Sequence, residues 1–132
     1  MDPIYISTKG DDIVTLAKRI ECEGYGLGVV ELSGQLLPTN GKKTSYYLCS
    51  DVSEEVLINS TKLPILRKIN FDNEGNVHDI YSKVLLLRVE RTPISRINLY
   101  ITDSEGRRQP FEGKGLNCTL VLIPAGKYKY IW

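Results

Sequence analysis

The chain has 132 residues, of which 42% are hydrophobic and 25% charged. This length and composition indicate one ordinary globular domain and exclude a disordered chain. The 17 basic and 16 acidic residues give a net charge of +1, so the overall field predicts neither a nucleic-acid partner nor an anionic membrane. No apolar run approaches the roughly 20 residues of a membrane span, and residues 1–12 lack the basic start and apolar core of a secretion signal. We therefore expect one domain over residues 1–126 with a tail at 127–132, no membrane partner, and no secretion through a signal peptide.

The composition favours β structure. The chain contains 13 Ile, 9 Val, 8 Thr and 8 Tyr but only two alanines, and branched and aromatic side chains suit the pleated, half-buried surface of a strand. Short apolar runs alternate with turn residues at fairly even spacing, which is typical of a sandwich or barrel. The candidate strands are residues 4–7, 13–22, 25–32, 44–49, 55–59, 63–71, 82–90, 94–102 and 116–123. In the run 94–102, Ile97, Leu99 and Ile101 alternate with Asn98, Tyr100 and Thr102 and should share one face. One of the weaker runs could be loop, and residues 33–43 are expected to form a long one.

The second candidate, residues 13–22, fits two structures. Ile13, Leu16, Ala17 and Ile20 have helical spacing, and Asp11 or Asp12 could serve as an N-cap. The β-branched run at 13–15 and the all-β surroundings favour a strand instead. Periodicity alone leaves the two interpretations balanced.

Residues 103–106 carry a clear turn signal, Asp-Ser-Glu-Gly. Asp103 suits the first position of a type I turn, and Gly106 supplies a left-handed residue. We expect these residues to be structural and to join the strands at 94–102 and 116–123 as a hairpin.

Residues that could carry chemistry are few and isolated. The three cysteines, Cys22, Cys49 and Cys118, have neither disulfide-framework nor zinc spacing, and we expect buried thiols. His78 is the only histidine, so an acid–base pair or triad would lack a second imidazole. The glycine-rich run 24–28 is followed by a strand and does not predict a nucleotide site. We predict no enzyme activity, no metal and no cofactor, and two short basic clusters are too weak a signal to predict a nucleic-acid partner.

Two blocks of the sequence form a recognisable pattern. In residues 47–67 the pattern residues are Tyr47, Ser50, Asp51, Glu54, Ile58, Pro64, Leu66 and Arg67. In residues 97–120 they include Ile97, Leu99, Ile101, Asp103, Gly106, Arg107, Pro110, Phe111, Glu112, Thr119 and Leu120. Together with a weaker match at 25–31, the blocks resemble the small jelly-roll capsid proteins of Maverick/Polinton elements and adintovirus-like DNA viruses.

This resemblance implies a fold and a role. The implied fold is an all-β, single eight-stranded antiparallel jelly-roll sandwich, which favours a strand at 13–22. The implied role is that of a penton-like or minor capsid subunit, a structural protein of the virion assembled inside the host cell. Its partners would be further copies of itself, a pentamer ahead of a trimer, and a major capsid protein. The alternative is a host-recruited jelly-roll module that binds protein, carbohydrate or nucleic acid on its loops.

Four residues of the first block receive roles. We expect Asp51 to bind backbone N–H groups of the turn that follows its strand. Pro64 is expected to form a rigid corner, after which Arg67 can meet a carboxylate such as Glu54. The alternative places Asp51 and Arg67 at a contact with a neighbouring subunit.

The tail at 127–132 is aromatic and basic. In an extended chain Tyr128, Tyr130 and Trp132 lie on one side, because side chains alternate along a strand. Aromatic side chains are favoured at subunit interfaces, so we predict that this tail packs across a subunit boundary. The alternative is that it closes the sandwich of its own chain.

Overall fold

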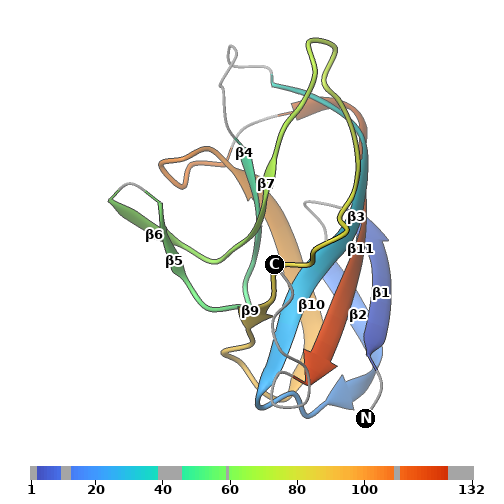
Figure 1. Ribbon diagram of the computed structural model, residues 1–132, viewed down its shortest axis with the longest axis vertical. Helices are drawn as coiled ribbons and strands as arrows, with labels where there is room; N and C mark the ends of the chain where they lie inside the picture. Colours follow the sequence, from blue (N-terminus) through green and yellow to red (C-terminus); the bar gives the residue numbers. More distant parts are fainter. Residues whose placement is uncertain (1–2, 10–12, 39–45, 59, 109–110, 125–132) are drawn as a thin grey trace.

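The computed structural model of the protein describes residues 3–9, 13–38, 46–58, 60–108 and 111–124 (Figure 1). The described residues contain strands and no helix, so the all-β expectation is confirmed. The strands are β1 Ile4–Lys9, β2 Ile13–Ile20, β3 Tyr25–Pro38, β4 Tyr46–Ser50, β5 Val56–Ile58, β6 Thr61–Leu63, β7 Ile65–Ile69, β8 Asn76–Ile80, β9 Leu87–Arg88, β10 Ile94–Thr102 and β11 Phe111–Pro124.

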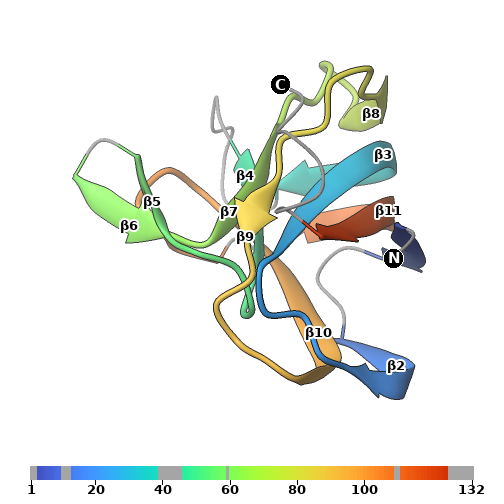
Figure 2. The ribbon, with the colours of Figure 1, turned by 60° about the horizontal axis from the view of Figure 1, so that its bottom comes forward.

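Two antiparallel sheets face each other in a β-sandwich (Figures 1 and 2). The first sheet has the order β1-β11-β3-β8, with the short β9 also paired to β3, and the second has the order β2-β10-β4-β7. A separate two-stranded sheet, β5-β6, projects to one side (Figure 1). The described part of the chain thus has eleven strands in three sheets instead of the eight strands expected.

The core lies between the two large sheets and follows from the alternation of side chains along each strand. Ile97, Leu99 and Ile101 of β10 are almost completely buried, as are Leu120 and Leu122 of β11. The alternation that the sequence shows at 94–102 is therefore the inward face of a sandwich strand. The other fully buried leucines on this core include Leu27, Leu32, Leu48, Leu66 and Leu116.

The disputed second segment forms the strand β2 at the edge of its sheet. Its pairing with β10 is irregular, because Ile20 lies opposite Ile94 whereas Thr15 lies opposite Arg96. Six residues of β2 therefore lie opposite three residues of β10, and the three extra residues form an irregular bulge. Bulges at an edge strand hinder pairing with another chain. The helical spacing of Leu16, Ala17 and Ile20 falls largely within this irregular stretch.

Strand β3 corrects one expectation, because it continues to Pro38 where the sequence predicts a loop from residue 33. Gly34, which falls in the expected loop, lies inside the strand with φ 142°. A Cβ atom built on Gly34 would lie 2.1 Å from the carbonyl oxygen of Gly115 on β11. The glycine therefore permits a close approach of two backbones and does not end the strand.

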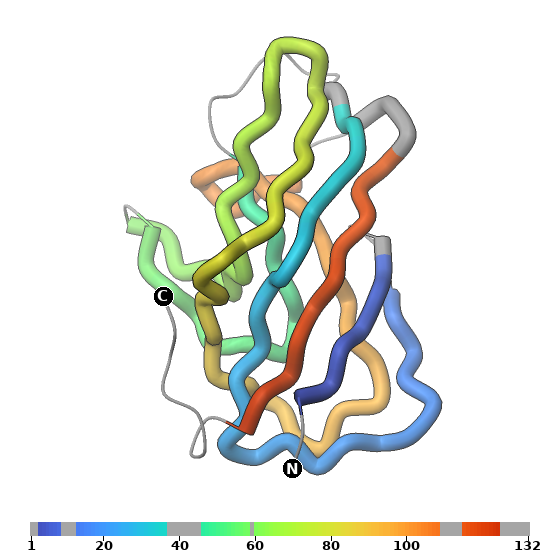
Figure 3. Tube along the Cα trace, turned by 45° about the vertical axis from the view of Figure 1, so that its right-hand side comes forward, coloured from blue at the N-terminus to red at the C-terminus, as the bar shows by residue number. Residues whose placement is uncertain are grey.

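The segment 82–90, predicted as one strand, is strand only at β9, and β8 lies where no strand was predicted. Tyr81 donates its backbone N–H to Val30 of β3 at 2.9 Å, after which the chain passes along β3 to β9 (Figure 3). Leu85 and Leu86 lie against Gly28 and Gly26. A Cβ on Gly28 would be 2.6 Å from the Leu85 carbonyl oxygen, so the glycine-rich run makes room for this crossing segment.

The turn at 103–106 forms as expected, but the prediction that it closes a hairpin is wrong. β10 pairs with β2 and β4, whereas β11 pairs with β1 and β3 in the opposite sheet. Among the described residues, a single isolated bridge, between Thr102 and Arg108, joins the two sides of the turn. The turn therefore carries the chain from one sheet to the other.

Candidate interaction surface

A second apolar cluster lies outside the main core, on the other face of the β4-β7-β10 sheet. It consists of Tyr47, Cys49, Leu63 and Ile65, with Tyr100 and two residues of β5 packed against it. Tyr47 and Cys49 flank Leu48, which points into the core, so alternation directs them outward. The β5-β6 hairpin covers this outward face and buries it.

A groove of about 530 Å³ opens beside this cluster. Val56 and Ile58 of β5 form one wall, residues 85–87 form another, and Ile65 and Tyr47 belong to the lining. Glu54, Arg67 and Lys68 are its charged residues. We call this feature the hairpin groove. It brings together residues that are up to 40 positions apart in the sequence, from Tyr47 to Leu87, so no local pattern could have predicted it.

Arg67 lies at the hairpin groove, but not in the ion pair that the sequence suggests. Its guanidinium carbon stands 3.8 Å from the centre of the Tyr81 ring, a cation–π contact. No ion pair found among the described residues joins Arg67 to Glu54, so that expectation is wrong. Burial raises the pKa of Tyr81, and the charge of Asp79 adds to the increase.

Glu54 instead fastens the start of the hairpin to β9. Its Oε2 atom accepts the backbone N–H of Arg88, while its own backbone N–H donates to the Arg88 carbonyl at 2.8 Å. Both bonds are to backbone atoms, so they hold the β9 wall of the groove in place whatever the side chain of Arg88 does. The structural role expected for Glu54 is in keeping with this geometry.

Asp51 also binds a backbone N–H group, although not one of the following turn. Its Oδ1 atom accepts the N–H of Asn98 in β10 at 2.9 Å, and its own N–H donates to the Asn98 carbonyl at 3.2 Å. Arg91 lies 3.8 Å from Oδ2. Asp51 therefore extends the pairing of β4 with β10 beyond the end of β4.

Pro64 separates β6 from β7, where the sequence predicts a corner. A proline has no N–H group to donate and so interrupts a ladder, but its carbonyl still accepts the N–H of Ser50 at 3.0 Å. The corner directs β6 out into the hairpin and β7 back into the sheet.

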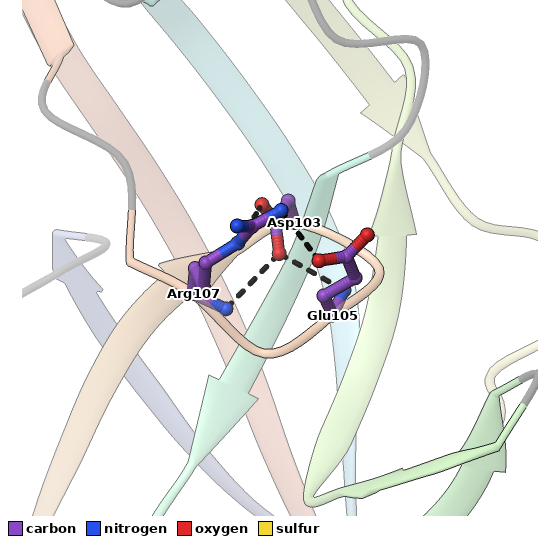
Figure 4. A network of polar contacts seen from close by, with 3 residues as sticks. All are labelled: Asp103, Glu105 and Arg107. Carbon is purple, nitrogen blue, oxygen red and sulfur yellow. Dashed lines mark hydrogen bonds and ion pairs between the residues drawn. The ribbon is translucent and has the colours of Figure 1, made fainter.

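The 103–106 turn is held by the Asp103 carboxylate, which is almost completely buried (Figure 4). Its Oδ1 atom accepts backbone N–H groups from Glu105 at 2.9 Å and Arg107 at 3.0 Å. Burial acts to raise the pKa of Asp103, but these hydrogen bonds and the nearby Arg107 guanidinium outweigh it and lower the pKa. Gly106 has φ 84°, and a Cβ built there would lie 2.9 Å from Leu63. The turn therefore packs directly on the hairpin.

The cysteines and the histidine, which could carry chemistry, do not come together in a site among the described residues. All three cysteines are free and buried, and burial raises the pKa of Cys49 to about 11 and that of Cys118 to about 12. Such thiols are protonated at neutral pH and are poor nucleophiles. His78 is exposed, 3.9 Å from a carboxylate oxygen of Glu31. Within the described ranges, no group of three or more His, Cys, Asp or Glu side chains could hold a metal ion.

The basic pair at 107–108 is engaged locally. Arg107 contacts the carboxylates of Asp103 and Glu105, and Arg108 lies 4.2 Å from the centre of the Tyr100 ring. Tyr128, Tyr130 and Trp132 lie outside the described residues, so their subunit contact stays a prediction.

No family model matches the chain. No curated protein matches it. In the part of the chain that the structure describes, no helix is long and apolar enough to cross a membrane.

Proposed function

We propose that the protein is a structural capsid subunit, penton-like or minor, built on a jelly roll. The observation that carries the proposal is the pairing of eight strands, β1, β2, β3, β4, β7, β8, β10 and β11. Taken in chain order, the first pairs with the last, the second with the seventh, the third with the sixth and the fourth with the fifth. These are the pairs of one long antiparallel hairpin.

Rolling such a hairpin into a barrel-like sandwich adds two further pairs. The eighth strand meets the third, and the seventh meets the fourth, which correspond to β11 with β3 and β10 with β4. Eight strands in two facing sheets with this wrapping are the pattern of a jelly roll. In this interpretation β5, β6 and β9 are short additions between the fourth and seventh of the rolled strands.

The capsid role rests on this topology together with the sequence resemblance. A capsid subunit works through contacts and needs no reacting group. The shifted pKa values of the cysteines, tyrosines and aspartates among the described residues fit this role, because burial or turn hydrogen bonds are the main cause of each shift. The subunit would associate with copies of itself and with a major capsid protein, and become part of the virion.

The first test is the assembly state of the purified protein. Light scattering and sedimentation should give a closed oligomer, a pentamer ahead of a trimer, and electron microscopy should show rings. A folded monomer at every concentration would contradict self-assembly. The gene neighbourhood distinguishes the capsid subunit from the alternative, a host-recruited binding module. Neighbouring genes for a major capsid protein, a packaging ATPase and a protease support a capsid role, whereas an isolated intron-bearing host gene supports a binding module.

The role of Arg67 can be tested by combining these assembly measurements with urea unfolding. Arg67→Ala should lower the free energy of unfolding by about 0.5–1 kcal/mol, because the contact with the Tyr81 ring is lost. Lys68→Ala, at an exposed neighbour, is the control and should have almost no effect. Unchanged stability with lost assembly would instead place Arg67 at the subunit contact.

A further inference from the structure

We propose that the hairpin groove is the docking site of residues 127–132 of the same chain. This inference concerns the free subunit and does not depend on a capsid role. The aromatic residues that the sequence assigns to a subunit boundary would then have an acceptor on their own molecule.

The groove has the chemistry of an acceptor for aromatic side chains. Val56 and Ile58 line it from one side and Leu85 from another, and all three are only half-buried. Apolar side chains gathered in an open groove favour a covering partner. Of its three charged residues, Arg67 is already held on Tyr81 and Lys68 is exposed. Glu54 supplies the one carboxylate of the lining.

The tail has the complementary pattern. In an extended chain Tyr128, Tyr130 and Trp132 share one side, and Lys127 and Lys129 lie on the other. The aromatic side can cover the apolar walls. The lysines then point away from the apolar walls, and their long side chains can reach toward the carboxylates of Glu54 in the lining and of its exposed neighbour Glu55.

The described chain ends at Pro124, in the strand next but one to β9, and β9 forms part of the groove wall. Pro124 is paired with Tyr25 at the start of β3, and the Tyr25 carbonyl accepts the N–H of Val89, next to β9. β9 supplies Leu87 to the groove wall and lies between the start of β3 and the β5-β6 hairpin (Figures 1 and 3).

The distances allow docking within one molecule. Two strand spacings from β11 to β9 amount to about 10 Å, and eight residues beyond Pro124 span up to about 26 Å when extended. A short connection also gives a high effective concentration, which favours a segment of the same chain over one from a second copy.

The single tryptophan of the chain, Trp132, reports docking in the full-length protein. Docked in an apolar groove, it should emit at shorter wavelength than free tryptophan and resist quenching by acrylamide. Ile58→Thr keeps a β-branched residue in β5 but makes the wall polar, so emission should shift to longer wavelength and quenching should rise. Leu57→Thr makes a comparable change at the exposed neighbour, 64% accessible, and should leave both readings unchanged.

A proximity measurement covers the case in which Ile58→Thr does not fold. Lys68→Cys carries a nitroxide quencher at the groove, and Lys62→Cys carries it on β6 as the control; the native cysteines are buried and should not be labelled. The label at 68 should quench Trp132 strongly, and the label at 62 weakly.

Three results would overturn the proposal. The first is a Trp132 that is fully accessible in the unmodified protein. The second is equal quenching from positions 62 and 68. The third is protection that disappears on dilution in step with dissociation measured by light scattering, which would assign the groove to the tail of a second copy.

Discussion

Two turns of the molecule, residues 72–75 and 103–106, share the sequence Asp-x-Glu-Gly and the same hydrogen bonds. In both, the Asp carboxylate accepts the backbone N–H groups two and four residues further on, at 2.8 to 3.0 Å. In both, the glycine has a left-handed φ, 80° at Gly75 and 84° at Gly106. Both turns also carry the chain from the β2-β10-β4-β7 sheet to the β1-β11-β3-β8 sheet.

The two turns differ in what surrounds them. Asp72 is exposed, whereas Asp103 is 3% accessible and its turn packs on Leu63 of the hairpin. Water can replace the exposed carboxylate of Asp72, whereas the site of the Asp103 carboxylate is almost closed to water. The same four-residue pattern thus sets the shape of both turns, and the surroundings decide how strongly the fold depends on each.

The largest difference should appear when each carboxylate is removed. Asp103→Ala removes an almost completely buried carboxylate and leaves two partly buried N–H groups without their acceptor, so it should lower the free energy of unfolding by about 2–3 kcal/mol. Asp72→Ala should cost clearly less, because solvent satisfies the freed groups. Urea unfolding of the two variants measures both values, and equal losses would show that burial does not separate the turns.

The second largest loss of stability is expected at Gly106, the glycine of the 103–106 turn. Gly106→Ala combines a left-handed backbone with a Cβ only 2.9 Å from Leu63, and we expect a loss of about 2 kcal/mol. Gly24 has φ 79° and no atom within 4 Å of a built Cβ, so Gly24→Ala should cost about 1 kcal/mol from the backbone alone. Thermal unfolding compares the pair; a smaller loss at Gly106 than at Gly24 would exclude the packing contribution.

Acid should affect the two turns in the same direction. Hydrogen bonds from Asn76 and Glu74 lower the pKa of Asp72. The pKa of Asp103 is also lowered, although burial opposes the decrease. A carboxylate with a lowered folded pKa stabilises the fold above its unfolded pKa, and that contribution is lost as the pH falls through the folded pKa.

Urea unfolding from pH 6 down to pH 3 should therefore show decreasing stability. In Asp103→Asn the decrease should be shallower, because one linked group is gone. An unchanged slope in that variant would exclude Asp103 from the acid response.

The smallest effect is expected from making the two turns identical. Ser104→Asn gives residues 103–106 the sequence of residues 72–75. The second position of the turn provides none of the hydrogen bonds described above, so the free energy of unfolding should change by less than about 0.5 kcal/mol. A larger loss, measured in the same urea series, would mean that the pattern is not interchangeable between the two surroundings.

The sequence by itself determined the local features of this protein. The abundance of branched and aromatic residues predicted an all-β chain, and the alternation in 94–102 predicted the inward face of β10. The turn at 103–106 followed from Asp103 and Gly106 because their hydrogen bonds and φ angle involve only neighbouring residues. These features depend on residues within a few positions of one another.

Only the tertiary structure decided which strands pair and which side chains meet. A turn of the same shape can join paired strands or carry the chain to the opposite sheet, and the shared core made the second arrangement at 103–106. Gly34 could be recognised as a close-contact residue only once the fold had placed the Gly115 carbonyl oxygen against it. Arg67 had a nearby carboxylate in the sequence but found Tyr81 in space. The hairpin groove likewise has no sequence signature, because its walls come from segments that the fold, and not the chain order, places side by side.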